Sequence, residues 1–208
     1  MNKKHVVISL TTIPSRITKI GPTIDSLINQ SYKVDAIYIS IPPFCDRLGT
    51  KYPEYVFPPE VTIIHPSKDY GPATKLLGLL ECVDVKDYIV IVDDDRHYDK
   101  ELVEKLLAKS DEEPNSIING FPVKVQFAGA PGVLVRKQFI DKCIFKIPPF
   151  LKLHDDCWFT LYFQKRNIPV DTASIGNRLL FAKIEKIKII VFKTDLKTML
   201  FIYKRIYS

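Results

Sequence analysis

The stretch from Ile89 to Asp95 constrains this chain more than any other. Four β-branched residues, which favour a strand buried on both faces, run directly into three consecutive aspartates. Three like charges at the end of a strand are unfavourable unless a positive group binds there. Side chains alternate along an extended backbone, so we expect Asp93 and Asp95 on one face and Asp94 on the other. Asp93 and Asp95 would form a platform for Mg²⁺ or Mn²⁺, although a solvated acidic loop gives the same pattern.

Composition indicates one folded domain with a basic surface. The 208 residues are 46% hydrophobic and 26% charged, which excludes a chain that is mostly disordered. The net charge of +6 suits a phosphate-bearing partner or an anionic membrane surface, and it also fits a surface that is basic for solubility alone. The basic residues belong to no recognisable nucleic-acid-binding motif, so we expect no nucleic-acid partner.

The cysteines and the amino-terminal segment predict a cytoplasmic protein. Cys45, Cys82, Cys143 and Cys157 form no C-x-x-C pair and have no histidine at zinc spacing, so we expect free thiols in a reducing compartment. The apolar run 5–10 is too short for a signal peptide, and no apolar run is long enough to span a membrane.

Short apolar strands alternate with helical patterns along the chain. We expect strands at 6–10, 36–41, 61–64, 89–92 and 133–135, with one or two more within 116–127. Helices are expected around 20–28 and at 73–82, 100–108 and 154–166. This alternation is typical of βαβ units in a doubly wound, mostly parallel sheet.

Three polar loops, 11–16, 68–75 and 93–97, should meet at the carboxyl edge of that sheet, where ligands of such folds bind. Arg16 and Lys75 would then lie beside the metal platform. A diphosphate would complete the shell of a bound Mg²⁺ and meet both cations. A surface position at the start of a helix is an equally good interpretation of Lys75.

A second acidic motif is His154-Asp155-Asp156-Cys157-Trp158. Two carboxylates at the start of a helix can simply stabilise its dipole. They can also supply a general base that deprotonates an acceptor hydroxyl, as in glycoside chemistry. Trp158 is either a sugar platform or a core residue.

The last segment, 183–208, mixes lysines with apolar residues at helical spacing. A helix packed on the domain is the commoner source of this pattern, and a basic amphipathic helix at a membrane surface is the other. We therefore expect a domain over residues 1–182 and a basic tail over 183–208, packed on the domain or in peripheral contact with a membrane.

Four blocks in this order resemble small GT-A fold glycosyltransferases similar to family 2, which occur in bacteria and in large DNA viruses. The blocks are VVISLTTIPSRI, DYGPATKL, VDDD and HDDCWF, and the likeness runs from about His5 to Phe163. The resemblance implies an α/β fold of the GT-A type, a Rossmann-like sandwich whose mostly parallel central sheet is flanked by helices.

The resemblance also implies a role for each matching residue. The nucleotide-sugar pocket would contain Thr11, Ile13, Arg16, Asp69, Lys75, Asp93 and Asp94. Asp95 would be the principal ligand of Mn²⁺ or Mg²⁺, with Asp93 beside it. The catalytic base would be Asp156 in preference to Asp155. Many such enzymes add a late histidine as a metal ligand, but no histidine follows His154 here.

The implied activity is transfer of a hexosyl or deoxyhexosyl group from a nucleoside-diphosphate sugar, with a UDP-sugar favoured, to a hydroxyl of a glycan or glycoconjugate. The reaction would depend on a divalent metal and invert the anomeric centre. One alternative is a nucleotidyltransferase that makes nucleotide sugars, but loop 11–16 lacks the glycines of such enzymes. The other is a non-catalytic nucleotide- or membrane-binding module, against which the intact acidic pair argues.

Overall fold

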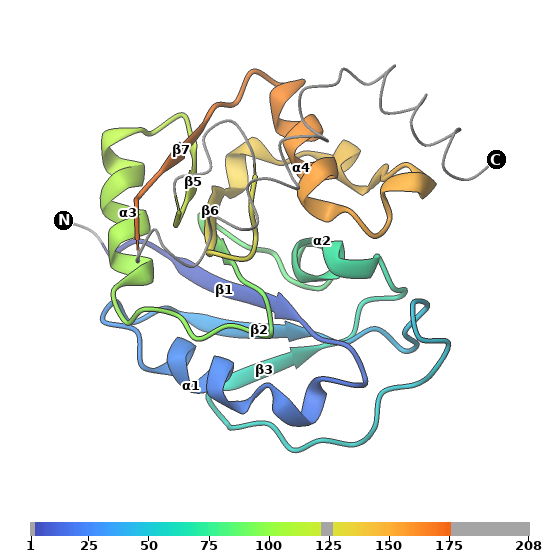
Figure 1. Ribbon diagram of the computed structural model, residues 1–208. Coiled ribbons are helices and arrows are strands. Elements are labelled where there is room, and N and C mark those ends of the chain that lie inside the picture. Colours follow the sequence, from blue (N-terminus) through green and yellow to red (C-terminus); the bar gives the residue numbers. More distant parts are fainter. Residues whose placement is uncertain (1–2, 122–126, 176–208) are drawn as a thin grey trace. The chain divides into compact units, whose positions relative to one another are not determined.

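The computed structural model describes residues 3–121 and 127–175 (Figure 1). Its strands form one seven-stranded sheet in the order β3-β2-β1-β4-β6-β5-β7. The strands are β1 (Val6–Thr11), β2 (Ala36–Ser40), β3 (Val61–Ile64), β4 (Tyr88–Ile91), β5 (Ile117–Asn119), β6 (Val133–Arg136) and β7 (Val170–Thr172).

The amino-terminal half of the sheet is parallel. β1 pairs with β2 on one side and with β4 on the other, and β2 pairs with β3. The chain therefore moves outward from β1 to β3 and then crosses back to β4, so the strand order reverses beside β1. The α/β fold with a mostly parallel sheet, expected from the sequence, is confirmed.

The carboxyl-terminal half adds an antiparallel strand. β6 runs antiparallel to both β4 and β5, while β5 and β7 are parallel. Ile91 at the end of β4 lies opposite Val133 at the start of β6, so the loop before β6 lies at the same edge as the aspartates after β4. The sequence predicted a strand at 133–135 but neither its direction nor the existence of β7, because strand partners are chosen by tertiary contacts.

Helices cover both faces of the sheet (Figure 1). α1 (Gly21–Ile28) and α3 (Leu102–Glu112) pack on the face that carries Ile8 and Leu10, whereas α2 (Thr74–Cys82) and α4 (Asp155–Gln164) pack on the face that carries Val7. Burial on both faces explains why the central strands β1 and β4 are mostly apolar. The 3₁₀ helices are η1 (Ile17–Lys19), η2 (Gly71–Ala73), η3 (Lys137–Phe139), η4 (Lys142–Phe145) and η5 (Pro149–Leu151).

An aromatic cluster fixes α4 against the sheet. The ring of Phe127 lies 5.0 Å from that of Phe159 and 6.1 Å from that of Phe163, and all three side chains are fully buried. Trp158 packs against the same cluster, and its indole N–H donates to the carbonyl of Ile144 at 2.8 Å. These contacts favour the core interpretation of Trp158.

Some expectations fall partly or wholly outside the described residues. The tail 183–208 and the boundary at residue 182 lie there, so the domain division and the membrane contact stay predictions. All four cysteines are described and free. Among the described helices, none has the length and apolar character needed to cross a membrane.

Gly120 offers a test of how β5 is joined to the loop before β6. Its N–H donates to the carbonyl of Gly132 at 2.7 Å, and a Cβ at this position would collide with the backbone carbonyl of Pro131. Gly120→Ala should therefore lower the free energy of unfolding by about 1–3 kcal/mol, measured by urea denaturation. Gly21→Ala is the matched control, because a Cβ there meets no atom within 4 Å. Equal stability of the two variants would contradict this packing.

Candidate active site

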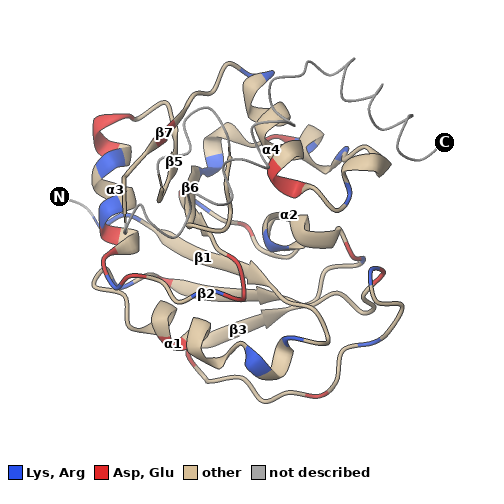
Figure 2. Ribbon diagram, in the orientation of Figure 1, with Lys and Arg blue, Asp and Glu red and all other residues tan. Residues whose placement is uncertain are grey.

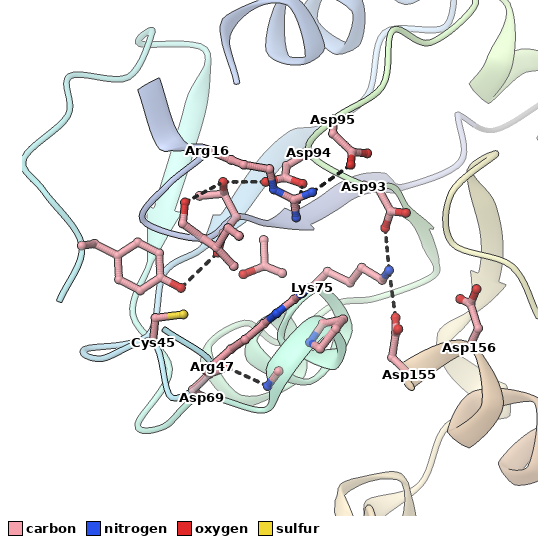
Figure 3. A pocket seen from close by; sticks show the side chains of 16 residues that line it. Arg16, Cys45, Arg47, Asp69, Lys75, Asp93, Asp94, Asp95, Asp155 and Asp156 are labelled. Carbon is pink, nitrogen blue, oxygen red and sulfur yellow. Dashed lines mark hydrogen bonds and ion pairs between the residues drawn. The ribbon is translucent and has the colours of Figure 1, made fainter. Parts of the chain in front are cut away.

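A pocket opens at the carboxyl edge of β1 and β4, and the charged side chains of the predicted loops meet in it (Figure 3). In Figure 2 the start of α4 is acidic and the start of α2 is basic. The lining residues are Thr11, Thr12, Ile13, Arg16, Cys45, Arg47, Tyr52, Asp69, Gly71, Pro72, Lys75, Asp93, Asp94, Asp95, Asp155 and Asp156. Every residue predicted for the site from the sequence is among them.

The three aspartates lie beyond the end of β4 rather than in the strand. β4 ends at Ile91, and the chain turns at Asp94 and Asp95. The expectation of an extended backbone through Asp95 is therefore wrong, because alternation of side chains holds only within a strand. All three aspartates nevertheless line the pocket, and the Asp94 side chain is almost completely buried.

Asp94 connects the turn to the loop after β1. Its carboxylate accepts a hydrogen bond from the Thr12 hydroxyl at 2.6 Å and pairs with Arg16 at 2.9 Å. Its backbone carbonyl accepts from the Thr23 hydroxyl at 2.9 Å. Burial raises the pKa of Asp94, although Thr12 and Arg16 act in the opposite direction. These contacts favour a structural role for Asp94.

Arg16 pairs with a second carboxylate as well. Its Nη1 lies 2.8 Å from Oδ2 of Asp95, and both side chains are partly open to solvent, 39% and 51% exposed. Arg16 thus bridges the buried Asp94 and the more exposed Asp95 (Figure 3).

Lys75 is the buried cation of the site. Its side chain is 5% exposed, and its ammonium lies 2.6 Å from Oδ1 of Asp93 and 2.8 Å from Oδ2 of Asp155. Burial alone would lower the pKa of Lys75, but the charges of Asp155, Asp93 and then Asp156 outweigh it and hold that pKa well above its usual range. Burial would raise the pKa of Asp93, but the charge of Lys75 and its hydrogen bond act more strongly in the opposite direction, so the pKa of Asp93 is lowered.

The two acidic residues at the start of α4 have different surroundings. Asp155 is buried and paired with Lys75. Asp156 is half-buried, and its Oδ1 accepts a hydrogen bond from the backbone N–H of Gly129 at 3.0 Å. Gly129 belongs to the loop before β6, which lies at the same edge as the aspartates, and this hydrogen bond joins that loop to the start of α4.

The other side of the pocket is built by the loops after β1, β2 and β3. The Thr11 hydroxyl donates to the carbonyl of Ser40 at 2.7 Å. Asp69 accepts from the N–H of Gly71 at 2.6 Å and from the N–H of Asp46 at 2.9 Å. Asp69 thereby holds the loop before α2 against the loop after β2, and Ile13 faces the same space.

Sequence reasoning missed several residues of the site. Cys45 and Arg47 belong to a short loop that is closed by an antiparallel backbone β-bridge between Cys45 and Thr50. Tyr52 also lines the pocket, and its hydroxyl donates to the carbonyl of Thr12 at 3.0 Å. Nothing in the local pattern of 44–60 distinguishes these residues from an ordinary polar loop. Tyr98 does not line the pocket, but its hydroxyl accepts from the N–H of Asp93, and the sequence analysis gave it no role although it stands three residues after Asp95.

The donor chemistry of the turn fits a hard divalent cation. Asp93 and Asp95 supply carboxylate oxygens, which Mg²⁺ and Mn²⁺ prefer, and each ion pair uses one oxygen of its carboxylate. Within residues 3–121 and 127–175, no group of three or more His, Cys, Asp or Glu side chains could hold a metal ion. A metal here would take its remaining ligands from water and from a substrate.

A family model described as glycosyl transferase family 2 matches residues 15–186. The chain therefore belongs to this family of enzymes, as the four sequence blocks predicted. No curated protein matches the chain.

Solved structures of TarS from S. aureus share the fold. One structure of TarS 1–349 has a TM-score of 0.52 and 14% identity, and the match covers 83% of this chain and 59% of that one. The structure of TarS 1–349 in complex with UDP has a TM-score of 0.51, with the same identity and coverage. A longer TarS structure has a TM-score of 0.53 and 15% identity, and that match covers 81% of this chain and 35% of the TarS chain. The present chain thus spans little more than half of the shorter TarS chains.

Tyr98 allows a test of what holds the aspartate turn. Its buried hydroxyl accepts from the N–H of Asp93 at 2.8 Å and lies 3.1 Å from the carbonyl of Ala130, to which it donates. Tyr98→Phe leaves these groups unsatisfied and should cost about 1–3 kcal/mol of stability in urea denaturation. Tyr55→Phe serves as the control, because the Tyr55 ring packs on Phe57 and its hydroxyl has no hydrogen bond within the described residues. If both variants unfold at the wild-type urea midpoint, the Tyr98 hydroxyl does not support the turn.

Proposed function

We propose that this protein transfers a sugar from a nucleoside-diphosphate sugar, with a UDP-sugar favoured, to a hydroxyl of a glycan or glycoconjugate. The observation that carries the proposal is one pocket in which the aspartate turn and the acidic start of α4 face each other across Lys75, in a chain of glycosyl transferase family 2. The structure of TarS with UDP supports the choice of a uridine nucleotide.

The donor would bind along the loops after β1, β2 and β3. Thr11, Ile13 and Asp69 line the part of the pocket that we propose for the nucleoside. Two arginines line the pocket: Arg16 is partly exposed, and Arg47 is exposed. Within the described residues Arg47 has no ion pair. Both guanidinium groups suit the diphosphate, because Arg binds phosphate oxygens in a bidentate manner.

Asp95 and Asp93 would hold Mn²⁺ or Mg²⁺. The more exposed Asp95 is the better candidate for the principal ligand, since Asp93 is also committed to Lys75. When bound, such a metal supplies a Lewis acid beside the charge that develops on the leaving diphosphate. Arg16 pairs with Asp95 in the described structure, so binding of a metal and a diphosphate would give Arg16 a new anionic partner in place of that carboxylate.

Asp156 is the better candidate for the catalytic base. A base must reach the acceptor hydroxyl, and Asp156 is more exposed than the buried Asp155, whose carboxylate is ion-paired with Lys75. The N–H of Gly129 orients the Asp156 carboxylate. The acceptor hydroxyl would attack the anomeric carbon on the face opposite the leaving nucleoside diphosphate while Asp156 takes its proton, which inverts the anomeric centre.

Donor binding can be tested with Asp95→Ala. Isothermal titration calorimetry with UDP and Mn²⁺ should show affinity reduced by about 10- to 100-fold or more, because the principal metal ligand is lost. Asp25→Ala is the control, since Asp25 is exposed on α1 and its carboxylate has no partner within the described residues. Wild-type affinity for UDP in the Asp95 variant would exclude the metal role.

The catalytic step can be tested with Asp156→Asn. Hydrolysis or transfer of a panel of UDP-sugars in the presence of Mn²⁺ should slow by about 10²- to 10⁴-fold, because the base is lost. The Kd for UDP should stay within about threefold of the wild-type value, because Asp156 contacts no part of the nucleotide in this proposal. A variant that keeps more than a tenth of the wild-type turnover would exclude Asp156 as the base.

The same panel addresses the alternatives. A nucleotidyltransferase would form a nucleotide sugar from UTP and a sugar 1-phosphate, whereas a glycosyltransferase would not. A module that only binds nucleotides would shift in melting temperature with UDP and turn over no donor.

A further inference from the structure

We propose that Lys75 is a positioning residue that couples the metal-binding turn to the base-bearing start of α4. This inference rests on the proposed function and deepens it. The bridge from Asp93 through Lys75 to Asp155 would fix the distance between the departing diphosphate and the attacking hydroxyl, and Asp156 would be held in place through its neighbour.

The first support is the burial and pairing of the ammonium. The Lys75 side chain is 5% exposed, and two carboxylates from distant parts of the sequence lie within 2.8 Å of its nitrogen. A cation that serves mainly to bind a diphosphate would need to face the open part of the pocket, as the exposed Arg47 and the partly exposed Arg16 do. Lys75 is instead enclosed between protein groups, which suits a link within the site.

The second support is the position of Gly129. A Cβ on Gly129 would lie 2.7 Å from the Lys75 nitrogen and 3.5 Å from Oδ1 of Asp93, so the missing side chain makes the space in which the bridge forms. The N–H of the same residue donates to Asp156 at 3.0 Å. One glycine therefore accommodates the bridge and orients the proposed base.

The third support is the way the two acidic residues divide their contacts. Asp155 faces Lys75 and is buried, and the adjacent Asp156 faces the pocket and Gly129. Because the two residues are consecutive at the start of α4, fixing Asp155 also restricts the position of Asp156. Misplacing a reacting group by about 1 Å can cost about 100-fold in rate.

The test is a double-mutant cycle with Lys75→Met and Asp155→Asn, read out as kcat for the best UDP-sugar of the panel and as the Kd for UDP with Mn²⁺. Each single variant should lose about 100-fold in kcat, with a Kd for UDP within about threefold of wild type. The double variant should lose no more than the worse single variant, because both substitutions break the same bridge. Lys105→Met is the control, because Lys105 is a partly exposed residue of α3 whose ammonium pairs with Glu101, the residue before that helix.

Other outcomes decide against the proposal. A loss of tenfold or more in UDP affinity for Lys75→Met, or losses in kcat that multiply in the double variant, would mean that Lys75 acts directly on the diphosphate. Wild-type protein that turns over no UDP-sugar would overturn the proposed function and this role with it. Active wild-type protein with a tenfold weaker Kd in Lys75→Met would overturn this role alone.

Gly129→Ala keeps the proposal testable if Lys75→Met does not fold. The added methyl group displaces the ammonium while leaving all three charges in place. It should reproduce the loss in kcat with nearly unchanged UDP affinity, and Gly21→Ala should affect neither. An unchanged kcat in a folded Gly129→Ala variant would overturn the proposal.

Discussion

The ion pairs of the buried Lys75 are the interaction on which the described pocket depends. Burying an ammonium without partners would be very costly, and losing one partner of a buried pair typically costs about 3–5 kcal/mol. The chain meets this requirement with Asp93 after β4 and Asp155 at the start of α4. These pairs bring together two acidic motifs that lie about sixty residues apart in the sequence.

The sheet topology makes this meeting possible. Parallel strands β1 and β4 deliver Arg16 and the aspartate turn to one edge, and the antiparallel β6 starts at that same edge, so the loop before it, which contains Gly129, lies there too. The aromatic packing of Phe127 against Phe159 then seats α4 beside the same loop. Acidic groups and cations of the pocket are consequently held close together.

The same geometry separates three aspartates that look equivalent in the sequence. Asp94 points into the protein toward Thr12 and Arg16, Asp93 pairs with Lys75, and Asp95 remains about half exposed. The three carboxylates therefore differ in their surroundings: the buried Asp94 supports the turn, and Asp95 is the most exposed of the three. Roles for donor, metal and base are the proposals that follow from this division.

The sequence by itself determined the apolar strands, their alternation with helices and the four motif blocks, because hydrophobic periodicity is a local property. It also predicted which polar loops converge, since parallel strands share a carboxyl edge. Only the tertiary structure decided that the backbone turns at Asp94, that β6 runs antiparallel, and that Arg47 lines the pocket. The partners of Lys75 were decided there as well, because an ion pair between residues 75 and 155 depends on packing that no local pattern records.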